Sequence, residues 1–68
     1  MPDIPLDRQI AAVRDEISKR RRLYPRWVDA GRMKEDESQD RIAAMEAVLA
    51  TLKQLKDERA AKVQPALF

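Results

Sequence analysis

The 68-residue sequence contains no cysteine and no histidine. Without cysteine, no disulfide framework can stabilise the chain, and without either residue the usual zinc sites are excluded. The same absences remove the ordinary nucleophile–base pairs of covalent catalysis, and a single glycine excludes a glycine-rich phosphate loop. We therefore expect a protein that is not an enzyme and that uses no cofactor, metal or small-molecule substrate.

Long apolar runs are also missing. No stretch approaches the roughly 18 apolar residues that a membrane-spanning helix needs. The first residues, MPDIPLDRQI, lack the basic region and apolar stretch of a secretory signal, so a cytoplasmic protein is expected. A chain of this size buries only about 60% of its unfolded surface, so one small domain of marginal stability is expected.

Charged residues are abundant, at 38%, and with so little glycine this composition favours long helices. A first helix is expected to begin near Pro5. Its apolar positions recur at helical spacing: Leu6, Ile10, Val13, Ile17, Tyr24 and Val28. Pro25 interrupts this pattern and predicts a kink or a short break, because it removes a helical hydrogen bond. Gly31 suits the left-handed conformation that ends many helices.

A second helix is expected to open around residues 34–37, three of which are acidic and favoured there by the helix dipole, and to run to about Lys62. Its apolar stripe is Ile42, Met45, Val48 or Leu49, Leu52 and Leu55. The sequence therefore predicts an all-α fold, an antiparallel two-helix hairpin over residues 1–62 with a tail peptide at 63–68. A hairpin leaves much of both stripes exposed, so we expect a homodimer that forms a four-helix bundle. The alternative is a monomer that completes its core on a partner protein.

A basic run is the candidate for nucleic-acid binding: Lys19, Arg20, Arg21 and Arg22, with Arg26 nearby. Lys19, Arg22 and Arg26 share one helical face. Phosphate contacts from that face would be weak, non-specific and sensitive to salt. The alternative is a solvated face that pairs with the acidic residues 35–40.

The segment YPRWVDAGRM, residues 24–33, resembles small helical proteins encoded by phages and prophages. These carry a Tyr-Pro-x-x-Val-x-x-Gly-x-Met segment before a second helix with a run similar to MEAVL, here residues 45–49. The resemblance implies a phage origin and a helical hairpin, with no established activity. Tyr24 and Trp27 are candidate protein-binding residues, because aromatic side chains are enriched in binding hot spots. Alternatively they close one end of the core, and we expect Trp27 to be buried against the second helix or a partner chain.

The sequence ends in QPALF, which resembles the peptides by which bacterial replication and repair proteins dock on the DNA sliding clamp. Gln64, Leu67 and Phe68 match the pattern Gln-x-x-Leu-Phe. The resemblance implies that Gln64 hydrogen-bonds at the rim of the clamp pocket and that Leu67 and Phe68 fill its apolar subsites. The leading expectation is thus a phage-type adaptor or inhibitor in the bacterial cytoplasm. The alternatives are the basic nucleic-acid-binding protein and a structural bundle that binds another host protein, with the tail packed on the helices.

Overall fold

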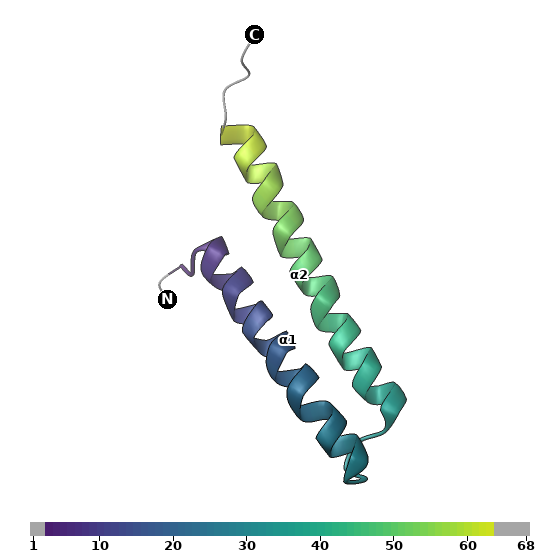
Figure 1. The fold of residues 1–68 in the computed structure, drawn as a ribbon. Coiled ribbons are helices and arrows are strands. Elements are labelled where there is room, and N and C mark those ends of the chain that lie inside the picture. Colours follow the sequence, from purple (N-terminus) through teal and green to yellow (C-terminus); the bar gives the residue numbers. More distant parts are fainter. Residues whose placement is uncertain (1–2, 64–68) are drawn as a thin grey trace.

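The computed structural model describes the backbone of residues 3–63 and the side chains of residues 3–61. These residues form two helices, α1 at Leu6–Asp29 and α2 at Glu35–Val63. The helices run side by side in opposite directions and are joined by a short connection (Figure 1). The predicted all-α helical hairpin is therefore confirmed. Within the described residues, neither helix combines the length and apolar character needed to cross a membrane.

The first helix, α1, begins directly after Pro5, as predicted. Pro5 is the residue before the helix and has an extended backbone, with φ −57° and ψ 149°. Its carbonyl accepts the first helical hydrogen bond, from the Gln9 backbone N–H at 3.1 Å. The Gln9 side chain also donates to the Ile4 carbonyl at 2.8 Å. Asp7 adds a negative charge at the positive end of the helix dipole.

Of the kink or short break predicted at Pro25, the break is wrong, because α1 continues through this residue to Asp29. Proline lacks the N–H that would complete one helical hydrogen bond. The side chains on either side of it still pack on α2, since Tyr24 is buried and Val28 is half-buried. We infer that this burial offsets the lost hydrogen bond over the short remaining part of α1.

Gly31 ends α1 as predicted. It has a φ of +74°, in the left-handed region where glycine has no steric penalty. The Gly31 N–H donates to the Val28 carbonyl at 3.0 Å, and the Arg32 N–H donates to the Trp27 carbonyl at 2.8 Å. This pair of hydrogen bonds is the Schellman motif, which satisfies carbonyls left over at a helix end. The chain then turns into α2.

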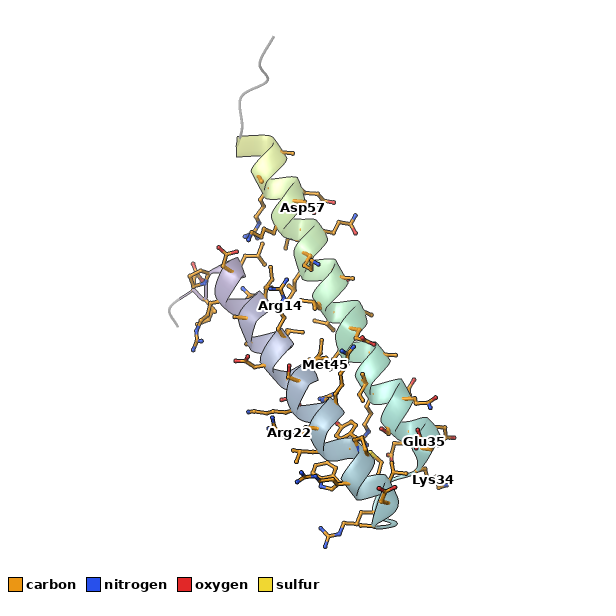
Figure 2. The ribbon with its side chains drawn as sticks, in the orientation of Figure 1. Arg14, Arg22, Lys34, Glu35, Met45 and Asp57 are labelled. Atoms are coloured by element: carbon orange, nitrogen blue, oxygen red, sulfur yellow. The ribbon has the colours of Figure 1, made fainter. Side chains whose placement is uncertain are left out.

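The core of the hairpin is thin. Only three hydrophobic side chains are buried among the described residues, Ile10, Ile17 and Tyr24, and they lie at intervals of seven along α1. The facing residues of α2 are half-buried: Ile42, Met45, Leu49, Leu52 and Leu55. Met45 lies between the two helices in Figure 2. Val48 is 43% exposed, so of the two candidate positions Leu49 is the one that faces α1.

Candidate functional site

The basic run does not form one surface, because consecutive residues point in different directions around a helix. Arg20 turns towards α2. Its Nε donates to Glu16 Oε2 at 2.8 Å, and its Nη1 donates to the Arg41 carbonyl on α2 at 2.9 Å. Its guanidinium also lies 5.8 Å from the centre of the Tyr24 ring. Arg20 therefore joins the two helices rather than offering its charge to a ligand.

Arg21 turns towards the other edge of α2 and pairs with Glu46. Both side chains are about half-exposed, so the pair contributes at most about 1 kcal/mol to stability. Two of the four cations of the basic run, Arg20 and Arg21, are therefore engaged in contacts within the hairpin.

Lys19, Arg22 and Arg26 are exposed and form no ion pair within the described part of the chain. Arg22 lies on the side of α1 away from α2 (Figure 2). The alternative pairing of this face with residues 35–40 is not found among the described residues, because the face points away from α2. Glu37 instead pairs with Arg41 along α2 at 3.1 Å. The three cations form a basic face that is free to meet an anionic partner.

The two aromatic candidates have different environments. Tyr24 is 6% exposed and belongs to the core, whereas Trp27 is 38% exposed. Their ring centres are 5.4 Å apart with an angle of 34° between the planes. The predicted burial of Trp27 against α2 is therefore wrong, and its burial against a partner chain stays a prediction. Val28, four residues after Tyr24, takes the position that faces α2, and Trp27 is turned about 100° to one side. Trp27 is thus the aromatic side chain that the hairpin offers to a partner.

The hairpin has two unlike sides. Ion pairs between the helices line one side, namely Arg21 with Glu46 and, at 2.7 Å, Lys56 with Asp7. The other side is marked by the hydrogen bond from Arg20 to the Arg41 carbonyl. Helical spacing places four apolar residues along this side of the hairpin, Leu23 and Trp27 three and seven residues after Arg20, and Val48 and Leu55 seven and fourteen residues after Arg41. We call these four residues the apolar side of the hairpin.

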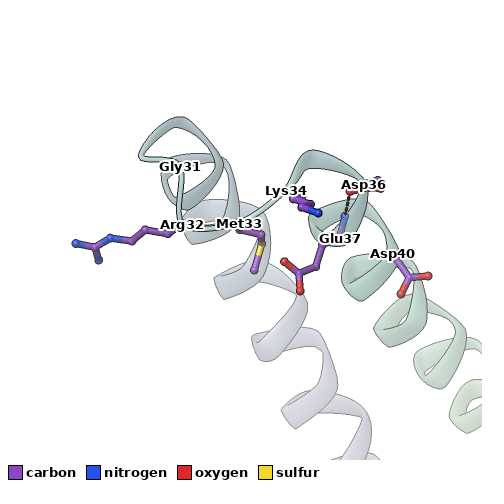
Figure 3. Close-up of a pocket in the computed structure, with 7 residues that line it drawn as sticks. All are labelled: Gly31, Arg32, Met33, Lys34, Asp36, Glu37 and Asp40. Carbon is purple, nitrogen blue, oxygen red and sulfur yellow. Dashed lines mark hydrogen bonds between the residues drawn. The ribbon is translucent and has the colours of Figure 1, made fainter.

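An open hollow lies at the connection between the helices (Figure 3). Its lining residues come from the connection and the first turns of α2: Gly31, Arg32, Met33, Lys34, Asp36, Glu37 and Asp40. Asp36 accepts a hydrogen bond from the Glu37 backbone N–H at 2.8 Å, and the three carboxylate residues are exposed. No group of acidic residues placed to hold a metal ion is found in residues 3–61. Acidic residues at a helix start are favoured by the dipole alone, so we assign no ligand to this hollow.

The far end of α2 extends beyond the start of α1 (Figure 1). Lys56 pairs with Asp7 in the first turn of α1, and residues 57–61 beyond it are all exposed. The clamp-type residues Gln64, Leu67 and Phe68 follow this exposed end in the sequence and lie outside the described residues.

Comparisons with protein families, curated proteins and solved structures found no match to this chain. The two resemblances drawn from the sequence therefore remain hypotheses.

Sequence reasoning missed the partners of the central arginines. Glu16 could have been found, because it lies four residues before Arg20 and such pairs meet on a helix. Glu46 and the Arg41 carbonyl could not, because their positions depend on how α2 is aligned along α1. The burial of Ser38 could not be predicted either, because it also depends on how α2 is aligned along α1.

Proposed function

We propose that this chain is a small helical protein-binding adaptor of phage type, which docks on the bacterial DNA sliding clamp through Gln64, Leu67 and Phe68. The observation that carries the proposal is the Gln-x-x-Leu-Phe pattern directly after the exposed end of α2. Residues 57–61 rise beyond α1, so the pattern follows a part of the helix that the rest of the hairpin does not cover. Such a location favours contact with a second protein.

The energetics suit a peptide of this kind. Burial of Leu67 and Phe68 in apolar subsites contributes about 1.5–3 kcal/mol each. Ordering the backbone costs about 1–2 kcal/mol per residue, and Pro65 reduces that cost because its φ is already restricted. We expect a dissociation constant of about 1 μM, which corresponds to about −8 kcal/mol, so contacts of the peptide besides Leu67 and Phe68 must contribute to binding.

The test is calorimetry of the full chain, and of a peptide of residues 62–68, with sliding clamps from several bacterial lineages. The full chain and the peptide should bind with similar per-site affinity and compete with a known clamp peptide. Gln64→Ala should weaken binding by about 1–2 kcal/mol, the scale of a partly buried hydrogen bond. Leu67→Ala with Phe68→Ala should abolish it without loss of helicity.

Ala66→Ser is the matched control, because the clamp-type pattern tolerates different residues at its middle places. This variant should bind like the unmodified chain. Absence of binding to every clamp would end the proposal. Loss of helicity in the Leu67→Ala, Phe68→Ala variant would show that these side chains belong to the core instead.

A second candidate function is weak nucleic-acid binding by the basic face, and one observation favours it. Lys19, Arg22 and Arg26 share the exposed outer face of α1 and are not used in ion pairs with described residues. Asp15 and Asp29 lie within four residues of this face and dilute its charge. We therefore expect affinity for phosphates without preference for a sequence.

A further inference from the structure

We propose that the apolar side of the hairpin, formed by Leu23, Trp27, Val48 and Leu55, is the docking surface for a second copy of this chain. The two copies then form a four-helix bundle in which α1 of each lies over α2 of the other. This proposal is independent of clamp docking by the tail, since none of these four residues belongs to residues 63–68.

The first argument is the distribution of burial. Two exposed large hydrophobic side chains, Trp27 at 38% and Val48 at 43%, lie on this side. Leu23 and Leu55 beside them are half-buried. The opposite side carries the two ion pairs that join the helices, Arg21–Glu46 and Lys56–Asp7, whereas the pairs Arg20–Glu16 and Arg41–Glu37 on this side each lie within one helix. A partner that buries apolar surface would therefore use one side of the hairpin only.

The second argument is the core that the single hairpin lacks. None of the described side chains is fully buried, and α2 contributes no buried hydrophobic residue although five of its aliphatic side chains face α1. A small domain without disulfide or metal must find further apolar burial by association. A second copy is the occupant that is present wherever this chain is made, so folding can be completed without another gene product.

The third argument is charge complementarity. α1 contains seven basic and four acidic residues, a net charge of +3, and α2 contains five basic and seven acidic residues, a net charge of −2. Placing α1 over α2 of the other copy therefore brings together helices of opposite net charge. A dimer with α1 over α1 would instead bring two positive helices together. The small net charge of the chain, +2, leaves little general repulsion between copies.

The test is sedimentation equilibrium of the full chain over a range of micromolar concentrations. We expect a species of twice the 7.9 kDa chain mass. Val48→Lys should raise the dissociation constant by about 100-fold or more, because it places a charge in the apolar contact. Ala50→Lys is the matched control, because Ala50 is exposed beside Arg21 and Glu46 on the opposite side of α2, and it should stay dimeric.

Trp27 is the only tryptophan and gives a second measurement that needs no variant. Its emission should shift to longer wavelength when the chain is diluted, at the concentration where sedimentation reports dissociation. This holds even if Val48→Lys fails to fold. The Leu67→Ala, Phe68→Ala variant should remain dimeric, which separates this surface from the tail.

Three results would overturn the proposal. One is a monomeric chain that melts cooperatively at all concentrations. Another is a dimer that Ala50→Lys dissociates and Val48→Lys does not. The third is a dimer whose Trp27 emission does not change on dilution.

Discussion

Replacing Gly31 by alanine isolates the contribution of one backbone angle to the stability of the hairpin. A Cβ built at Gly31 meets no atom within 4 Å, so a steric clash with a neighbouring group contributes nothing. The φ of +74° remains, and an L-residue pays about 1–2 kcal/mol to adopt the left-handed conformation. For a domain of this size, each kcal/mol shifts the melting temperature by about 4–8 °C. We therefore expect Gly31→Ala to melt roughly 4–16 °C lower, and an alternative helix end would be needed to avoid this loss.

The measurement is thermal unfolding followed by circular dichroism, at one protein concentration because association also affects stability. Gly31→Asn is the matched control, since asparagine enters the left-handed region at less cost, and its melting temperature should fall between the other two. An alanine variant as stable as the unmodified chain would refute the reasoning. So would an asparagine variant that loses as much as the alanine variant.

Two further predictions concern the core and the basic face. Ile17→Ala should lower the free energy of unfolding by about 2–5 kcal/mol in urea titrations, whereas Ile4→Ala, at a residue 53% exposed, should change it by less than about 0.5 kcal/mol. Equal effects would contradict the burial pattern. Replacing Lys19, Arg22 and Arg26 by glutamine should remove the salt dependence of any binding to DNA or RNA, because counterion release scales with phosphate contacts. Tight binding to one DNA or RNA sequence near physiological salt would make nucleic-acid recognition the leading proposal in place of clamp docking.

The helices were predictable because their signals are local. Apolar residues recur with the period of a helix, and the acidic start of α2 and the glycine after α1 mark ends through the dipole and a backbone angle. The predicted limits of α2, 34 and 62, lie one residue from the observed Glu35 and Val63. Pro25 was the exception. A local rule for proline predicted a kink or a short break there. The helix is not broken, and Tyr24 and Val28 on either side of Pro25 are buried and half-buried.

The exact inward-facing residues were less predictable than the helices. Neighbouring residues differ by about 100° around a helix, so a stripe that includes both Val48 and Leu49 fits two rotations equally well. The choice is made by the partner helix, whose own stripe sets the contact line. At the end of α1, Val28 on the predicted stripe is half-buried, whereas the neighbouring Trp27 is exposed. This is why an aromatic residue expected in the core became part of the exposed apolar side.

The basic run shows how a linear motif can mislead about a surface. Four consecutive residues are spread over about 300° around a helix axis, so a ligand on one face of the helix cannot contact all four cations. Arg20 and Arg21 bind the hairpin together, and only Lys19 and Arg22, joined by Arg26 one turn later, remain on the outer face. The electrostatic footprint is therefore three charges rather than five, which lowers the expected salt dependence of nucleic-acid binding.

Self-association and clamp docking would reinforce each other if both proposals hold. A dimer carries two copies of Gln64, Leu67 and Phe68, and the second docking event on a ring with repeated pockets becomes intramolecular. The gain depends on whether the two tails can reach two pockets at once, which the exposed length of α2 beyond Lys56 favours. Val48→Lys would then weaken the apparent affinity of the full chain for the clamp while leaving that of the isolated peptide unchanged. On these two proposals, the tail makes the contact with the clamp, and the second copy of the chain determines how many such contacts form together.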